Sequence, residues 1–213
     1  TSSGFSISWT AVVDAVSGYK LDVSRYSNFS TLLTNYNNLT VSGTSISVTG
    51  LNSGTNYYYR VRAVNGSNVS INSTQVNVLT KPDAPDADPI TVFSAVGFTA
   101  SWSSVNCDNY RLDVATTSNF AAGTFASGYQ NLQVNSTSQN VTNLPSGITY
   151  YYRVRAENTT GNSGWSTPNP TGILLLPATP TNPAISNVAT SSFTFSWTGV
   201  TPAVPYRVDV STS

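Results

Sequence analysis

Tyr57-Tyr-Tyr-Arg-Val-Arg-Ala63 is the most informative stretch of this chain, because it returns unchanged as Tyr150-Tyr-Tyr-Arg-Val-Arg-Ala156. In each copy an aromatic or apolar side chain stands at every second position, and the arginines fall between them. Alternation with a period of two residues is typical of a β-strand that buries one face. The stretch therefore predicts the same strand in two copies of one unit, which begin at residues 57 and 150 and so lie 93 residues apart.

Two shorter motifs recur around this strand, and each occurs three times. An alternating apolar run ends in a tryptophan at Trp9, Trp102 and Trp197. It is followed by Tyr19-Lys-Leu-Asp-Val23, Tyr110-Arg-Leu-Asp-Val114 and Tyr206-Arg-Val-Asp-Val210. A period of roughly 90 residues is too long for solenoid units, which run about 20 to 50 residues. It suits a string of small domains that fold independently.

The repeats predict the domain organisation. We expect a first repeat at residues 1–80 that lacks its first strand, a complete second repeat at 88–175, and the first three strands of a third repeat at 178–213. The joints at 81–87 and 177–183 carry prolines, which fix φ and stiffen a linker. The tandem is therefore expected to be an extended rod. Three strands with an open core do not fold alone, so we expect a neighbouring copy or further chain to cover the third repeat.

The spacing of these motifs resembles the fibronectin type III domain. The pattern is a tryptophan, then Tyr-x-Leu-x-Val, then Leu51-x-x-Gly-Thr-x-Tyr57, and the second copy matches it at Leu144, Gly147, Thr149 and Tyr150. The resemblance implies an all-β fold of tandem seven-stranded immunoglobulin-like β-sandwiches. It also implies that Tyr57 and Tyr150 form tyrosine corners, hydrogen-bonded to the backbone that precedes them. The local sequence around Phe29 and Phe120, Ser-Asn-Phe in both copies, looks like repeats in secreted surface proteins of Bacteroidota.

Composition excludes several classes of function. Charged residues make up 8% of the chain, against a usual share of roughly 25%. The net charge of zero favours neither nucleic acid nor an anionic membrane as a partner. The absence of histidine rules out triads that depend on it within this chain. No apolar run reaches membrane-span length, so this segment is expected to have no membrane span. We predict no catalytic, cofactor-binding or metal-binding residues and no enzymatic activity.

Charged residues recur at equivalent positions of two neighbouring strands in the predicted sheet. Asp22, Asp113 and Asp209 alternate with apolar residues, and arginines alternate in the same way along the neighbouring strand. Arg60 and Arg62 take these positions in the first repeat. We expect cross-strand ion pairs on a solvated face, worth roughly 0.2–1 kcal/mol each.

Trp165 is the candidate surface contact, together with Arg153 and Arg155. Trp165 lies in Gly164-Trp-Ser166 and is expected to have no counterpart in the first repeat, where the alignment places Asn65-Gly-Ser-Asn-Val69 in the same region. Two interpretations stay open. The indole stacks on Arg153 or Arg155 as a cation–π pair, or it is exposed and contacts a sugar or a protein.

These observations predict a structural or adhesive repeat region of a long extracellular cell-surface or filament protein, acting as a stiff modular rod. Its partners would be adjoining repeats, neighbouring copies and glycans. The alternative is a spacer or carbohydrate-binding accessory region of a secreted polysaccharide-degrading enzyme. The flanking sequence separates the two, since further repeats favour the first and a catalytic domain favours the second.

Overall fold

The chain folds into β-strands in a computed structural model that describes residues 1–15, 17–90, 94–167, 172–201 and 205–211. The described elements are strands, apart from one short 3-10 turn, η1 (Thr34–Tyr36). They fall into two compact units, the first made of residues 1–85, 104–110 and 155–165 and the second of residues 86–103, 111–154 and 166–213. The predicted all-β class is confirmed.

The first repeat consists of two facing sheets. One pairs β1 (Gly4–Ser8) with β4 (Ser45–Thr49). The other has the order β3 (Leu39–Val41), β2 (Gly18–Ser24), β5 (Asn56–Asn65) and β6 (Asn68–Val69), with β7 (Val76–Leu79) also paired to β5. Apolar side chains of both sheets meet in one core, and they include Ile7, Leu21, Val23, Val48 and Tyr57. The period-two pattern therefore marks the buried face, as the sequence predicts.

The second repeat has the same sheet order. One sheet pairs β8 (Phe98–Ser101) with β11 (Ser138–Val141). The other runs β10 (Leu132–Val134), β9 (Asn109–Ala115), β12 (Thr149–Asn158) and β13 (Gly161–Asn162), and β14 (Ile173–Leu174) pairs with β12. Two sheet pairs of equal order confirm the predicted tandem of β-sandwiches.

An extra segment pairs with β8 in the second repeat. Ala87 forms an isolated antiparallel bridge with Trp102. The Asp88 N–H donates to the Ser101 carbonyl at 2.9 Å, and the Ser103 N–H donates to the Asp86 carbonyl at 2.9 Å. The edge of β8 is therefore covered by the chain that leads into it.

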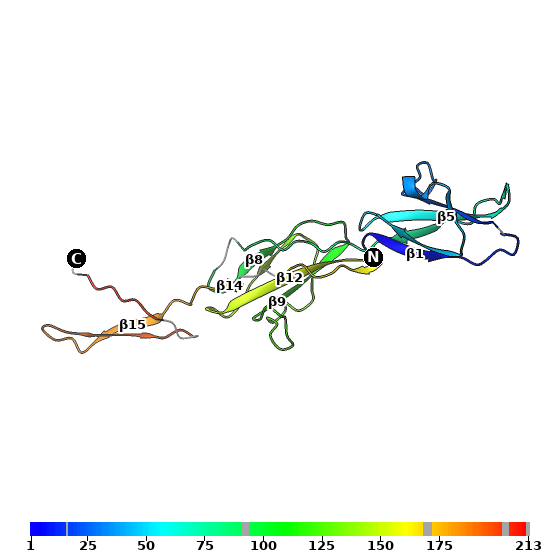
Figure 1. Ribbon diagram of the computed structural model, residues 1–213. Coiled ribbons are helices and arrows are strands. Elements are labelled where there is room, and N and C mark those ends of the chain that lie inside the picture. The colour runs from blue at the N-terminus through cyan, green and yellow to red at the C-terminus, as the bar shows by residue number, and fades with distance from the viewer. Residues whose placement is uncertain (16, 91–93, 168–171, 202–204, 212–213) are drawn as a thin grey trace. The chain divides into compact units, whose positions relative to one another are not determined.

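The third repeat is a hairpin of β15 (Thr181–Ser186) and β16 (Thr194–Thr198) (Figure 1). The strand predicted at Tyr206–Val210 does not form, since residues 205–211 have no regular structure. Its counterparts β2 and β9 are central strands bordered on both sides, by β3 and β5 and by β10 and β12. Without such neighbours, backbone groups gain no ladder partners and the strand is not stabilised. The described residues contain no helix long and apolar enough to cross a membrane.

Candidate functional site

Tyrosine hydroxyls tie loops to the ends of the central strands in both repeats. The Asn52 N–H donates to the Tyr57 hydroxyl at 2.9 Å, and the Tyr150 hydroxyl donates to the Pro145 carbonyl at 3.4 Å. Burial raises the pKa of Tyr150 above its ordinary value. Both bonds run back five residues along the chain, so the predicted tyrosine corners are confirmed.

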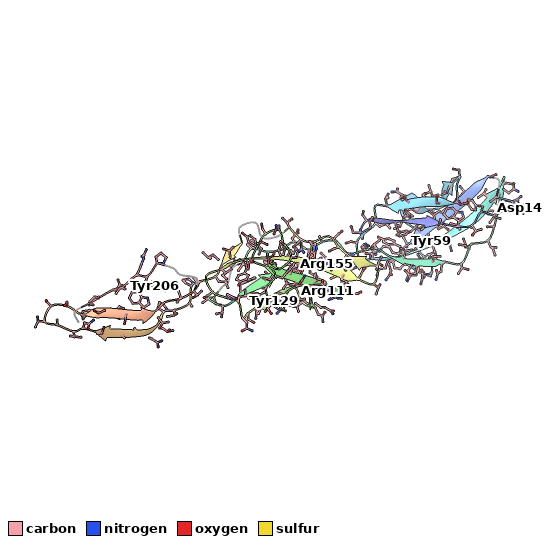
Figure 2. All side chains as sticks on the ribbon, turned by 90° about the horizontal axis from the view of Figure 1, so that it is seen from below. Asp14, Tyr59, Arg111, Tyr129, Arg155 and Tyr206 are labelled. Atoms are coloured by element: carbon pink, nitrogen blue, oxygen red, sulfur yellow. The ribbon has the colours of Figure 1, made fainter. Side chains whose placement is uncertain are left out.

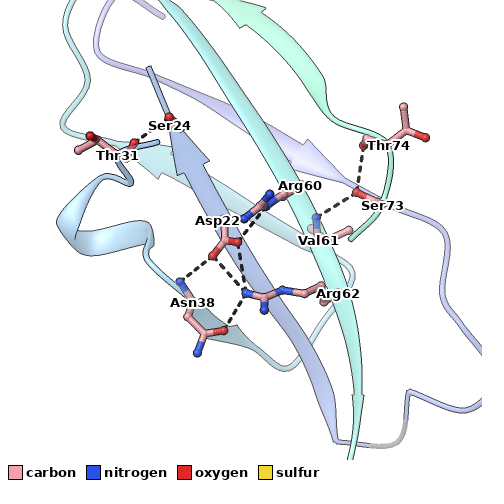
Figure 3. A network of polar contacts seen from close by, with 9 residues as sticks. All are labelled: Asp22, Ser24, Thr31, Asn38, Arg60, Val61, Arg62, Ser73 and Thr74. Carbon is pink, nitrogen blue, oxygen red and sulfur yellow. Dashed lines mark hydrogen bonds and ion pairs between the residues drawn. The ribbon is translucent and has the colours of Figure 1, made fainter. Parts of the chain in front are cut away.

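A buried carboxylate organises the outer face of the larger sheet in the first repeat (Figure 3). Asp22 lies on β2 directly opposite Arg60 of β5. Arg60 Nε donates to Asp22 Oδ2 at 3.1 Å, and Arg62 Nη2 donates to the same oxygen at 3.2 Å. The backbone N–H of Asn38 donates to Asp22 Oδ1 at 2.9 Å. The carboxylate therefore ties β2 to β5 and to the loop that precedes β3.

The second repeat builds the same arrangement around Asp113. Arg153 Nε donates to Asp113 Oδ2 at 2.9 Å, and Arg153 Nη2 lies 2.8 Å from that oxygen. The backbone N–H of Asn131 donates to Asp113 Oδ1 at 2.7 Å. Asn131 has a φ of 57°, and Asn38 has a φ of 58°. The loop approaches the carboxylate with the same left-handed backbone in both repeats.

A phenylalanine completes each arrangement. The guanidinium carbon of Arg60 lies 4.2 Å from the Phe29 ring centre, and that of Arg153 lies 4.4 Å from the Phe120 ring centre. These are cation–π distances. Phe29 and Phe120 have φ values of 54° and 53°, an uncommon conformation for a non-glycine residue that the surrounding contacts must stabilise. We call Asp22, Arg60 and Phe29, and likewise Asp113, Arg153 and Phe120, the Asp–Arg–Phe clamp.

The expected ion pairs form, but the expectation of a solvated face is wrong. Asp22 is 2% exposed and Asp113 is 3% exposed. The loops that carry Phe29 and Phe120 fold over the sheet, and an alternating strand pattern cannot reveal that cover. Losing one partner of a buried pair leaves an unpaired charge, which costs about 3–5 kcal/mol rather than the fraction typical of exposed pairs. The clamp is therefore a structural element of each repeat.

Trp165 stacks on Arg155, one of its two predicted partners. The Arg155 guanidinium carbon lies 4.5 Å from the Trp165 ring centre, whereas Arg153 stacks on Phe120. The indole is half-buried. The structure thus places Arg153 in the clamp and Arg155 with Trp165. The role of these three residues as a surface contact stays a prediction.

Two serines flank Trp165 and serve as backbone partners of β12. The Val154 N–H donates to Ser166 Oγ at 3.0 Å, and the Ala156 N–H donates to Ser163 Oγ at 2.9 Å. These hydroxyls replace carbonyls of a paired strand along the outer edge of β12. Trp165 is held between them, which fixes its position beside Arg155.

The first repeat contains the same serine pair. The Val61 N–H donates to Ser73 Oγ at 3.0 Å, and the Ala63 N–H donates to Ser70 Oγ at 2.9 Å. The structural counterpart of Trp165 is therefore Asn72, and the alignment with residues 65–69 is wrong. Sequence reasoning missed these serines, although the spacing Ser-x-x-Ser in both repeats could have revealed them.

The described side chains form no cluster of three or more residues from the types His, Cys, Asp and Glu that could hold a metal ion. The buried acidic residues Asp22 and Asp113 are paired with arginines. The geometry of the clamp holds strands together.

Comparison with models of protein families agrees with this geometry. The model of the fibronectin type III domain matches residues 1–78 and 84–171. A two-domain fibronectin type III segment of chicken tenascin is 21% identical with a TM-score of 0.50, over 78% of this chain and 90% of that one. The FN1–FN3 domains of chicken CNTN1 are 18% identical with a TM-score of 0.36, over 81% of this chain and 62% of that one.

A search of curated protein sequences finds no match, and the comparisons do not support the resemblance to surface proteins of Bacteroidota. Fibronectin type III domains are generally non-catalytic structural or binding modules. The family model covers well over half of the chain, and both repeats share the sheet order and the tyrosine corner. The chain therefore belongs to the fibronectin type III domain family.

Proposed function

We propose that this chain is a non-enzymatic structural or adhesive repeat region of a long extracellular or cell-surface protein, in which each repeat is a stiff module of a rod or filament. The observation that supports it most is the Asp–Arg–Phe clamp, which recurs in both repeats with nearly the same distances. The feature that both repeats share is thus a set of buried contacts that hold neighbouring strands together, as a stiff module requires. Adjoining repeats or neighbouring copies are the proposed partners.

The outer face of the smaller sheet also suits this role. Ser6 and Ser47 face each other across β1 and β4 with their hydroxyls 3.2 Å apart, and Thr99 donates to Asn140 across β8 and β11 at 2.9 Å. Hydroxyls and amides carry no net charge, so interactions between them are little affected by screening from salt. Such a surface suits a region exposed to a changing medium.

Location and shape provide the test. Antibodies against the chain should label intact cells that express the full-length protein, and labelling only after permeabilisation would overturn the extracellular assignment. X-ray scattering of the chain should give an elongated particle. Its maximum dimension should not change with ionic strength, because the net charge is zero. A compact globule would contradict the rod.

A second candidate function, glycan binding, is favoured by the half-buried Trp165 on its arginine. A ring held rigidly at the surface can stack on a sugar face at little entropic cost. On a glycan array, Trp165→Ala should abolish binding, while Asn72→Ala, at the matching position of the first repeat, should leave it unchanged. No binding by the unmodified chain at millimolar sugar would dismiss this candidate.

A further inference from the structure

The turn between β5 and β6 carries the single Asn-Gly dipeptide of the chain, Asn65-Gly66. Asn65 pairs with Asn68 across a loop of Gly66 and Ser67, and residues 65–70 are all exposed. Gly66 has a φ of 60°, a left-handed conformation that favours glycine in a tight hairpin turn. The backbone of the hairpin therefore requires a glycine directly after an exposed asparagine.

An asparagine followed by glycine can react with its own backbone. The Gly66 nitrogen attacks the side-chain carbonyl carbon of Asn65, so that a nitrogen–carbon bond forms and the side-chain amide nitrogen takes up the proton and leaves as ammonia. The product is a five-membered cyclic imide. Water then opens the ring at either carbonyl, which leaves an aspartate or an isoaspartate at position 65. The net reaction consumes one water, releases one ammonia and oxidises nothing.

The surroundings of Gly66 leave its nitrogen accessible. Its N–H donates to Ser17 Oγ at 2.9 Å, and both residues are exposed. Water can replace such a hydroxyl at little cost, since an exposed hydrogen bond contributes only a small net free energy. A Cβ added at Gly66 would meet no heavy atom of the described residues within 4 Å, its chain neighbours aside. The two reacting groups are therefore free to approach each other.

The second repeat protects the equivalent asparagine. Asn158 takes the place of Asn65 two residues after the repeated Tyr-Tyr-Tyr-Arg-Val-Arg-Ala strand, but it is only 7% exposed. Its Nδ2 donates to the Thr80 carbonyl at 2.9 Å, and its Oδ1 accepts the Thr160 N–H at 3.0 Å. All three residues of this contact belong to the first compact unit. The amide of Asn158 must leave both partners before it can react.

Asn72 shows a second kind of protection. Its side chain is exposed, but the nitrogen that would attack it belongs to Ser73. The Ser73 N–H donates to the Val61 carbonyl of β5 at 2.9 Å, and the Val61 N–H donates back to Ser73 Oγ at 3.0 Å. This nitrogen is held by the sheet, whereas that of Gly66 is held by an exposed hydroxyl. Asn72 is therefore a matched comparison for Asn65.

The reaction changes the charge at one end of the first repeat. Asn65 and Asn68 line a groove together with Asp14, Val12 and Val69, and Figure 2 shows Asp14 at the tip of the first unit. A carboxylate at position 65 places a second negative charge in this groove. An isoaspartate also lengthens the backbone by one carbon, so the pairing of Asn65 with Asn68 loses its register.

We propose that Asn65-Gly66 is a self-modification site, which converts without an enzyme to aspartate and isoaspartate and thereby adds a negative charge to the tip of the first repeat. Water is the only co-reactant. Asn72 and Asn158 remain amides while Asn65 reacts. This inference goes beyond the structural role proposed above and does not depend on where the protein is located.

Ageing the intact chain in mildly alkaline buffer tests the proposal. Peptide mapping by mass spectrometry follows the replacement of each side-chain amide by a carboxyl, and methylation by an isoaspartate-specific methyltransferase detects the isomer. Asn65 should convert at least about 10-fold faster than Asn72 and Asn158, which must first open locally. Asn65→Ser should remove both signals from this peptide. Conversion at Asn65 no faster than at the other two would overturn the proposal.

A second arm separates the effect of the fold from that of the dipeptide. Thr159→Gly, in an exposed turn, places an Asn-Gly dipeptide at 158–159, where the asparagine amide still donates to the Thr80 carbonyl. Asn158 in this variant should convert at least about 10-fold more slowly than Asn65 in the same chain. Equal rates would contradict the argument from exposure. In the aged chain, hydrogen exchange should be faster at 66–70, and unchanged exchange there would refute the loss of register.

Discussion

The strands β5 and β12 share the sequence Tyr-Tyr-Tyr-Arg-Val-Arg-Ala, yet they are buried to different extents. Tyr152 and Val154 of β12 are fully buried, whereas Tyr59 and Val61 of β5 are only half-buried. Identical residues are therefore buried to different extents, and the difference in burial must come from the segments around them.

The segment that precedes β8 accounts for this difference. Asp88 pairs with Ser101, and the Tyr152 hydroxyl donates to the carbonyls of both residues, at 2.7 Å in the case of Ser101. Among the described residues no strand pairs with the corresponding edge of β1. The comparison shows that the direction of a core side chain is set by its own strand. How far that side chain is buried also depends on the segment that pairs with the strand facing it.

Both repeats should depend strongly on the clamp despite this difference. Asp22→Ala and Asp113→Ala each remove a buried, charged hydrogen-bond acceptor and leave an arginine that is about a quarter exposed. Each should therefore lower the free energy of unfolding of its repeat by about 2–3 kcal/mol. Site-resolved hydrogen exchange in denaturant measures this separately for each repeat. Asp209→Ala, at an exposed carboxylate, is the control and should have almost no effect. Losses well below 1 kcal/mol would indicate ordinary exposed pairs.

Removing one tyrosine hydroxyl should lower stability more in β12 than in β5. Tyr152→Phe removes the hydroxyl that donates to the Asp88 and Ser101 carbonyls, and only Ser101 keeps another donor, the Asp88 N–H. The second repeat should therefore lose about 1–2 kcal/mol. Tyr59→Phe in the first repeat should change stability by no more than about 0.5 kcal/mol, as is usual away from buried polar networks. Chemical denaturation of the intact chain, followed by exchange in each repeat, compares them. Equal losses would show that the sealing segment does not matter.

Alkaline pH should affect the second repeat more than the first. Burial raises the pKa of Tyr152 to about 12, and its carbonyl partner only partly offsets the shift. Because the folded pKa lies above that of the unfolded chain, this stabilisation is complete below pH 10 and is lost as the pH rises towards 12. Unfolding midpoints measured between pH 9 and pH 12 should fall more steeply for the second repeat. Tyr152→Phe should flatten that fall, and an unchanged slope would contradict the assignment.

The smallest expected effect on stability is that of Trp165, which occupies the position of Asn72 in the first repeat. Trp165→Ala removes one cation–π contact with Arg155, worth about 0.5–1 kcal/mol at a partly exposed site. Asn72→Ala at the matching position should be neutral. Thermal unfolding of both variants measures this, and a larger loss would mean that the indole belongs to the core.

The sequence predicted the strands well because their signal is local. Alternation around Trp9 and Tyr57 marks buried faces without any knowledge of the partner strands. The burial of Asp22 could not be predicted in the same way, since it depends on a loop whose left-handed Phe29 folds back over the sheet. The missing strand at Tyr206–Val210 has a similar cause, because a strand signal gives no information about whether neighbours are present.

The repeated interior can be tested with a double-mutant cycle on Asp113 and Arg153 in the intact chain. The free energies of unfolding of Asp113→Ala, Arg153→Ala and the double variant give their coupling. A buried, hydrogen-bonded pair 2.8 Å apart should give a coupling of about 2 kcal/mol, within the range found for contacting residues. Additive losses, with a coupling near zero, would show that the carboxylate and the guanidinium do not hold the repeat together.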